Sequence, residues 1–196
     1  MRNKGSLLKE LPILVVVALV VSLFIKSFLV QFFFIPSGSM ENTLQIKDRV
    51  AVNKVPFISK NIERGDVVVF RDPNNWLPEI VDYSTNKYVA KAKSALVTVG
   101  VLPNPAKQYL VKRVIGVGGD RVVCCTKDGN LTINGVEVIE PYIFAGNKPS
   151  EMNFDVTVPK GKLWVMGDHR GASADSRYHQ EDINKGFVPV SKVSGR

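Results

Sequence analysis

The chain has 196 residues, of which 26 are Lys or Arg and 18 are Asp or Glu, so its formal charge is +8. This length suits one catalytic domain with its own core and a short appendage, and it excludes several large domains. The positive charge favours contact with anionic lipid headgroups or with nucleic acid. The basic residues are scattered and no aromatic–basic stacking motif occurs, which argues against nucleic acid as a partner.

The first predicted element is a membrane helix. An apolar run extends from Leu11 to Ile25 and is broken only by Pro12 and Ser22. This run is short against the ~20 residues that usually span a bilayer, but flanking leucines and the stems of flanking lysines extend it. A cleaved secretion signal is the alternative. Because a second apolar run follows at 28–35 and no Ala-x-Ala pair stands at the right place, an uncleaved anchor is favoured. We therefore predict one transmembrane helix at 11–27.

The charges around this helix predict its orientation. Three basic residues precede it: Arg2, Lys4 and Lys9. After Lys26, the next basic residue is Lys47. The positive-inside rule places residues 1–10 in the cytoplasm and residues 28–196 outside it. The sequence thus predicts a single-pass protein of the cell membrane, with an extracytoplasmic domain held close to the lipid bilayer.

The rest of the chain has the pattern of β-strands. Short runs rich in Val and Ile are strand signals, and they occur at Arg49–Asn53, Asp66–Phe70, Leu110–Val117, Arg121–Cys125, Leu131–Ile133, Val136–Ile139 and Leu163–Met166. Asp128-Gly129 and Asn134-Gly135 are typical of hairpin turns, and the second dipeptide joins two of these runs. Between residues 73 and 108 the pattern lapses, and we expect an insertion with a short helix around Tyr88 to Val99. The fold is therefore predicted to be mainly β.

The two cysteines, Cys124 and Cys125, are adjacent, a spacing that fits neither a disulfide framework nor a zinc site. Neighbours in a strand point to opposite faces, so we expect one packed and one exposed thiol rather than a vicinal disulfide. His169 and His179 are the only histidines. The sequence offers no set of metal ligands, and neither a metal nor another cofactor is expected.

Two segments contain candidates for catalysis. In Ile35-Pro36-Ser37-Gly38-Ser39-Met40, proline fixes the backbone and glycine frees it, so the turn can present a hydroxyl. Alone this signal is weak, and a polar loop is the alternative.

In the second segment, Lys112 shares one face of a strand with Leu110 and Val114. If that face is the core, burial lowers the pKa of the amine and makes it neutral near pH 7. The alternative is a solvent-facing lysine.

A third segment, Met166 to Arg177, is dense in polar residues and reads Met-Gly-Asp-His-Arg-Gly-Ala-Ser-Ala-Asp-Ser-Arg. In this order the three segments resemble the bacterial type I signal peptidases, membrane-bound Ser/Lys proteases of the S26 family. The resemblance covers residues 32–44, 64–70, 109–120 and 166–177. It implies a serine endopeptidase that removes N-terminal signal peptides from exported preproteins without a cofactor.

The resemblance also implies a role for each site residue. Ser39 is the expected nucleophile, with Lys112 as its general base. Ser37 would stabilise the oxyanion together with the backbone N–H of Ser39. Ser173 would hydrogen-bond and orient the Lys112 amine, and Gly167 would allow a close approach of the backbone. The other polar residues of the third segment would support the site, namely Asp175 and Arg177 as a pair and Asp168 and Arg170 as braces of the loop.

The fold implied by the resemblance is a signal-peptidase-like β catalytic core with a small inserted β region at about 121–162, preceded by one transmembrane helix. The implied substrates are signal peptides of the Ala-x-Ala type, with small residues at the first and third positions before the cut. Shallow pockets that exclude bulky residues would be lined by Phe33, Ile35, Met40, Leu110 and Val111. The adjacent cysteines and residues 134–142 are similar to the inserted region of family members from high-GC Gram-positive bacteria.

The sequence leaves three alternatives open. His169 stands where asparagine is usual in the family, so a Ser39–His169–Asp triad competes with Lys112 as the base. A non-catalytic, membrane-tethered β module would keep the anchor but has no need for Ser39, Lys112 and Ser173 together. A self-cleaving Ser/Lys regulator, or a peptidase for one dedicated substrate such as a pilin, would share the dyad.

Overall fold

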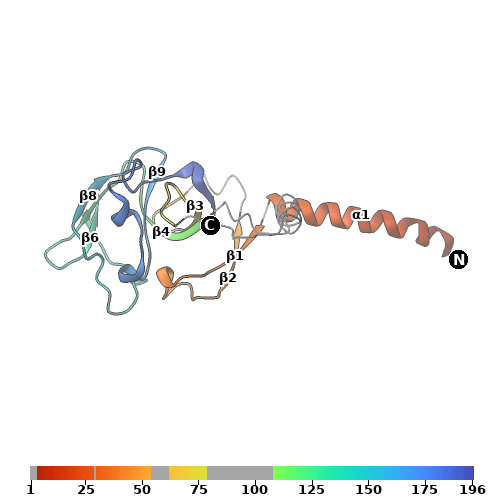
Figure 1. Cartoon of the computed structure of the whole chain (residues 1–196), viewed down its shortest axis with the longest axis horizontal. Coiled ribbons are helices and arrows are strands. Elements are labelled where there is room, and N and C mark those ends of the chain that lie inside the picture. Colours follow the sequence, from red (N-terminus) through yellow and green to blue (C-terminus); the bar gives the residue numbers. More distant parts are fainter. Residues whose placement is uncertain (1–3, 29, 54–61, 79–107) are drawn as a thin grey trace, which may run out of the picture.

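The structure is a computed structural model that describes residues 4–28, 30–53, 62–78 and 108–196. A long helix, α1 (Lys4–Phe28), projects away from a body made of strands (Figure 1). The predicted membrane segment, residues 11–27, lies within this helix. Among the described residues, no helix is both long enough and apolar enough to cross a membrane.

The strands of the described residues form three antiparallel sheets. A two-stranded sheet pairs β1 (Val30–Phe34) with β2 (Arg49–Asn53). A five-stranded sheet has the order β10-β9-β4-β3-β11, and a four-stranded sheet has the order β7-β6-β5-β8. The strands of these two sheets are β3 Val67–Arg71, β4 Tyr109–Val117, β5 Arg121–Cys124, β6 Leu131–Ile133, β7 Val136–Val138, β8 Phe154–Thr157, β9 Lys162–Met166, β10 Val188–Pro189 and β11 Val193–Gly195. Short 3-10 helices occur at η1 Gly38–Met40, η2 Arg170–Ala172, η3 Ser176–His179 and η4 Val190–Lys192.

The central strand of the five-stranded sheet is β4, which is rich in the β-branched residues that favour strands. Leu110, Lys112 and Val114 are buried, whereas the residues between them are partly exposed. This alternation places Lys112 on the core face of its strand, which decides between the two orientations that the sequence left open. The apolar cluster on this sheet consists of Val68, Phe70, Trp76, Leu110, Val114, Leu163, Val165 and Val188.

The four-stranded sheet packs against β9 through aromatic side chains. The ring centroid of Trp164 in β9 lies 5.3 Å from that of Phe154 in β8 and 5.5 Å from that of Phe187. The predicted hairpin closes this sheet, because Asn134 and Gly135 join β6 to β7 with φ values of 54° and 81°. A two-residue hairpin turn requires such left-handed conformations, and the predicted turn is confirmed.

Each predicted strand occurs within one residue of its expected bounds, but four observed strands were not predicted. β1 lies inside the second apolar run, where the sequence Val-Gln-Phe-Phe-Phe lacks the alternation that marks a half-buried strand. β8, β10 and β11 have four, two and three residues, which is too short to show a clear period. Of the expected insertion at 73–108, residues 79–107 lie outside the described residues, as does the helix expected at Tyr88 to Val99.

The prediction for the two cysteines is wrong. We expected two separate thiols, but the structure joins Cys124 and Cys125 in a vicinal disulfide across a cis peptide bond. The prediction applied the alternation of a strand to both residues. Because β5 ends at Cys124, that rule does not govern the direction of the Cys125 side chain.

Candidate active site

Ser39, the predicted nucleophile, lies in the tight turn η1 that follows β1. The residue is buried, and backbone hydrogen bonds hold the chain both before the turn and at Ser39 itself. The N–H of Ile35 donates to Asp48 O at 2.9 Å before the turn, and the N–H of His169 donates to Ser39 O at 3.2 Å. The turn therefore presents the Ser39 hydroxyl from a fixed backbone.

Lys112 reaches this hydroxyl from β4. Its Nζ lies 2.5 Å from Ser39 Oγ, and the residue is 4% exposed. Burial lowers the pKa of Lys112 to about 8, because apolar surroundings disfavour the charged amine. Nearby charges have smaller effects: Asp175 and Asp168 raise this pKa, and Arg177 lowers it. The site therefore contains a hydroxyl beside an amine that loses its proton at about pH 8.

Ser173, Asp175 and Arg177 form a buried polar cluster beside the lysine. One oxygen of Asp175, Oδ2, accepts hydrogen bonds from Ser173 Oγ at 2.8 Å and from the N–H of Gly167 at 2.9 Å. Arg177 donates to both carboxylate oxygens at 2.8 Å. We expected Ser173 to bond to Lys112, but its hydroxyl donates to Asp175, and within the described residues no hydrogen bond joins it to the amine. A carboxylate is the stronger acceptor of that proton.

Gly167 lies where two backbones approach closely. A Cβ at this position would lie 2.4 Å from Ser39 O and 2.3 Å from Ser173 Oγ. Both distances are far below van der Waals contact. The segment after β9 can therefore pass the nucleophile only because this residue has no side chain.

An apolar cleft of about 340 Å³ opens at Ser39 and Lys112. Every residue predicted to form the substrate pockets lines it, namely Phe33, Ile35, Met40, Leu110 and Val111. Ser37 lines the same cleft, and its hydroxyl makes no capping bond to η1. In the described part of the chain this hydroxyl has no hydrogen-bond partner, so it is available to a bound group.

Two strand edges with unpaired backbone face the cleft. Within the described residues, β1 pairs only with β2. In β4, residues 109–112 pair with β3, whereas the pairing with β9 begins only at Arg113. Such edges bind an extended peptide by backbone hydrogen bonds, with alternate side chains entering the pockets.

Another wall of the cleft, which was not predicted from the sequence, is formed by Trp76, Leu77, Ala172 and Ala174. Trp76 is fixed there because its Nε1 donates to Asp182 at 2.9 Å and its ring stacks on that of His179 at 4.4 Å. A local signal exists for the turn that presents this wall. The carboxylate of Asp72 accepts the backbone N–H groups of residues 74, 76 and 77, as aspartate does in turns.

The histidine alternative does not match the geometry. His169 Nδ1 lies 3.0 Å from a carboxylate oxygen of Glu41, and its ring stacks on Phe144 with centroids 4.2 Å apart. Asp168 is paired with Arg113 at 2.6 Å. In the described residues, no hydrogen bond joins the His169 ring to the Ser39 hydroxyl, so the side chains do not form a Ser–His–Asp triad.

A serine hydroxyl against a buried lysine amine, in an apolar cleft between two open strand edges, is the arrangement of a serine hydrolase for extended peptides. The family model described as "Signal peptidase, peptidase S26" matches residues 8–196. The chain belongs to this family, and it is accordingly a serine endopeptidase.

Three sequence relatives agree with this assignment. The chain is 38% identical to the probable signal peptidase I of Mycobacterium leprae, over 99% of this chain and 76% of that protein. It is 39% identical to signal peptidase I of Mycobacterium tuberculosis, over 98% of this chain and 72% of that protein. For signal peptidase I of Bacillus licheniformis, the identity is 33% over 98% of this chain and 88% of that protein. The crystal structure of a signal peptidase I from Enterococcus faecalis matches 69% of this chain and 95% of its own at 25% identity, with a TM-score of 0.42.

Proposed function

We propose that this protein removes N-terminal signal peptides from exported preproteins, with Ser39 as nucleophile and Lys112 as general base. The observation that carries the proposal is the 2.5 Å contact between Lys112 Nζ and Ser39 Oγ inside a peptide-sized cleft. Signal peptidase I proteins act on signal peptides, and membership of the family supports this class of substrate.

The base must be neutral before it can act. A pKa of about 8 leaves about one tenth of the Lys112 amines unprotonated at pH 7, against fewer than about one in a thousand for an ordinary lysine. Burial therefore provides the reactive form of the base. No metal or organic cofactor enters this mechanism.

The reaction then proceeds through an acyl-enzyme that water hydrolyses. Neutral Lys112 takes the proton of Ser39 Oγ, and Oγ bonds to the carbonyl carbon of the peptide. The Ser37 hydroxyl and the Ser39 N–H donate to the resulting oxyanion. The Lys112 ammonium gives its proton to the leaving amine, and the peptide C–N bond breaks. Lys112 then takes a proton from water, the hydroxide oxygen bonds to the ester carbon, and the proton returns to Ser39 Oγ as the ester bond breaks.

The open edges of β1 and β4 support binding of the signal peptide as an added strand. In such a strand the first and third side chains before the cut point to one face. That face would meet Phe33, Ile35 and Met40. Because these side chains are bulky, they leave room only for small substrate residues. This arrangement accounts for selection of Ala-x-Ala sequences.

We further propose that α1 anchors the enzyme in the lipid bilayer at 11–27, with residues 1–10 in the cytoplasm and residues 28–196 outside. The resemblance to the type I signal peptidases implies a membrane-bound enzyme. In β1, which follows α1, Phe32 and Phe34 are 68% and 56% exposed. Aromatic side chains are favoured at the level of the headgroups, so these residues would hold the cleft near the membrane surface.

The test is cleavage of a preprotein with an Ala-x-Ala site by the detergent-solubilised protein. We expect Ser39→Ala and Lys112→Arg to be inactive yet folded, because arginine keeps the charge but does not release its proton near neutral pH. His169→Ala is the matched control and should retain most activity. Normal cleavage by Lys112→Arg together with loss in His169→Ala would replace the dyad by a histidine mechanism. Normal cleavage by Ser39→Ala would remove the nucleophile assignment.

A further inference from the structure

The segment between β7 and β8 lies against the loop that carries Ser173, Asp175 and Arg177. We call residues 140–149 the bracing segment and residues 167–177 the catalytic loop. Hydrogen bonds from both backbone and side-chain atoms join these two segments. Phe144 N–H donates to Asp168 O at 3.0 Å, and Gly171 N–H donates to the Asn147 side chain at 2.8 Å. The catalytic loop is therefore held by a part of the chain that contains none of the proposed reacting groups.

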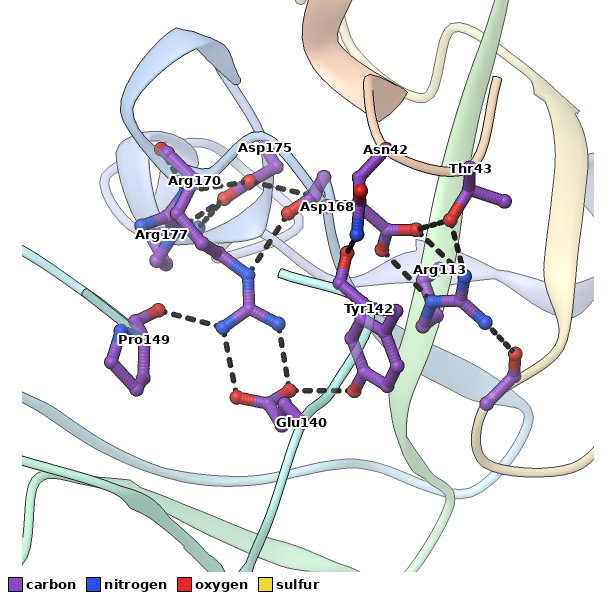
Figure 2. A network of polar contacts seen from close by, with 12 residues as sticks. Asn42, Thr43, Arg113, Glu140, Tyr142, Pro149, Asp168, Arg170, Asp175 and Arg177 are labelled. Carbon is purple, nitrogen blue, oxygen red and sulfur yellow. Dashed lines mark hydrogen bonds and ion pairs between the residues drawn. The ribbon is translucent and has the colours of Figure 1, made fainter. Parts of the chain in front are cut away.

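The strongest of these contacts is an ion pair between Glu140 and Arg170. Both side chains are almost fully buried, at 2% and 1% exposure, and two hydrogen bonds of 2.6 and 3.0 Å join them. Tyr142 Oη donates to the same carboxylate at 2.6 Å, and Arg170 also donates to Pro149 O at 2.7 Å (Figure 2). Removing one partner of such a pair leaves a buried charge without compensation, so the surrounding backbone must rearrange.

Arg170 connects this ion pair to the active site. Its Nε donates to Gly167 O at 2.9 Å, and its own carbonyl accepts from Arg177 Nη2 at 2.8 Å. Arg177 in turn binds both oxygens of Asp175. A shift of Arg170 therefore changes the backbone beside Ser39 and the carboxylate beside Lys112.

Tyr142 adds a second connection from the bracing segment. The guanidinium of Arg113, the residue after the base, lies 4.1 Å from the centroid of the Tyr142 ring. The side chain of Asn42, three residues after the nucleophile, donates to Tyr142 O at 3.2 Å. Arg113 also binds both oxygens of Asp168. Figure 2 shows these groups converging between β4, the turn after Ser39 and the catalytic loop.

We propose that Glu140 is a positioning residue for peptide cleavage, which acts through Arg170 to hold the catalytic loop against Ser39 and Lys112. The inference rests on the function proposed above. A purely structural ion pair would change the amount of folded enzyme and leave the properties of each folded molecule unchanged. A positioning residue changes the environment of the base itself.

The environment of Lys112 provides the readout that separates these roles. The charged groups that face the amine are Asp168, Asp175 and Arg177, all from the catalytic loop, and the Ser39 hydroxyl faces it from η1. If the loop loosens, water reaches the amine and its basicity rises toward that of an exposed lysine. The acidic limb of the rate profile then moves to higher pH.

The experiment compares Glu140→Gln with Asp155→Asn in the full-length chain in detergent, with an Ala-x-Ala peptide from pH 6 to 10. Asp155 pairs with Arg121 on the four-stranded sheet, but the side chains are 50% and 62% exposed. Both variants therefore change an acid into its amide within an arginine pair. Enzyme concentration is set by titration with a serine-directed covalent probe.

We expect Glu140→Gln to lose at least about tenfold in kcat, with KM within about twofold and the acidic limb of the rate profile displaced to higher pH. Asp155→Asn should match the wild type in all three quantities.

Tyr142→Phe covers the case in which Glu140→Gln does not fold, because it removes one hydrogen bond to Glu140 and keeps the ring. It should lose about two- to fivefold in kcat and move the limb in the same direction. If the limb stays in place in every variant that folds, or if kcat per titrated site equals that of the wild type, the positioning role is wrong. Activity in Ser39→Ala or Lys112→Arg would instead overturn the proposed function, whatever the Glu140 variant does.

Discussion

At Lys112, an amine occupies a position where the strand otherwise buries aliphatic side chains. Leu110 and Val114 flank it on the same face, and the residue itself is 4% exposed. Burial of a lysine without a carboxylate in direct contact lowers its pKa, and the value of about 8 reflects mainly this effect. The same burial that supplies a neutral base also costs folding free energy.

The first prediction concerns the pH dependence of cleavage. Since only neutral Lys112 accepts the Ser39 proton, kcat/KM should rise tenfold per pH unit below about 8 and level off above that pH. The measurement is kcat/KM for an Ala-x-Ala peptide from pH 6 to 10. A limb near pH 6.5 would point to a histidine base instead.

The second prediction concerns stability at the same residue. Lys112→Met should abolish cleavage but stabilise the protein at pH 7 by about 1 to 3 kcal/mol, because the cost of burying the amine is removed. The folded-state pKa is depressed, so the wild type carries this full cost below pH about 8 and loses it as the pH rises toward 10.5. Urea unfolding at pH 7 and pH 10.5 measures the difference. An equal stability gap at both pH values would contradict the explanation.

The third prediction concerns Gly167. An alanine here would place its Cβ 2.4 Å from Ser39 O, so we expect a loss of about 1 to 3 kcal/mol in stability and of tenfold or more in kcat. Gly171→Ala is the control in the same loop, because the nearest atom to its Cβ is 3.6 Å away. Thermal unfolding and peptide cleavage of both variants provide the comparison. Equal behaviour of the two alanines would show that the close approach at Gly167 is unimportant.

At the scale of elements, the cleft depends on where strand pairing stops. β1 has one partner in the described part of the chain, and β4 gains β9 as a partner only from Arg113 onward. The unpaired backbone thus lies next to the reacting groups. The turn η1 and the catalytic loop complete the site from outside the sheets.

The fourth prediction tests strand addition by the substrate. If the peptide pairs with both edges, N-methylation of its backbone amides at the first three positions before the cut should each lower kcat/KM by about tenfold. A peptide methylated at the fifth position after the cut is the matched control and should be cleaved normally. Unchanged kcat/KM for all peptides would mean that only side chains are recognised.

At the scale of the whole molecule, α1 projects from the end of the body that holds β1 and β2 (Figure 1). Its described side chains, residues 10–22, are exposed in the isolated chain. The exposed rings of Phe32 and Phe34 follow on the next element. An anchor in this position would present the cleft to substrates that emerge beside the membrane.

The fifth prediction concerns topology in the cell. Protease added outside intact cells should digest the region 28–196, while an epitope placed before Lys9 stays protected, because the basic N-terminus remains in the cytoplasm. Permeabilised cells, in which both regions become accessible, are the control. Protection of 28–196 in intact cells would reverse the proposed orientation.

The sequence by itself determined features that arise from neighbours along the chain. Alternation in β4 was enough to place Lys112 on one face with Leu110 and Val114, though not to show that this face is buried, and Asn134-Gly135 was enough to specify a hairpin, because both signals depend on local backbone geometry. The ordered motifs around Ser39, Lys112 and Met166–Arg177 were enough to indicate the family. The expected lining of the cleft also followed from those motifs.

Only the tertiary structure decided how distant segments meet. Glu140 and Arg170 are 30 positions apart, and no period or turn signal predicts that their charges meet in the interior. The sequence signals the turn at Asp72 but not that Trp76 reaches the cleft, and it does not show that the Ser173 hydroxyl bonds to a carboxylate. Hydrogen bonds and ion pairs of this kind depend on distances between side chains from separate elements, and packing fixes those distances only after the chain has folded.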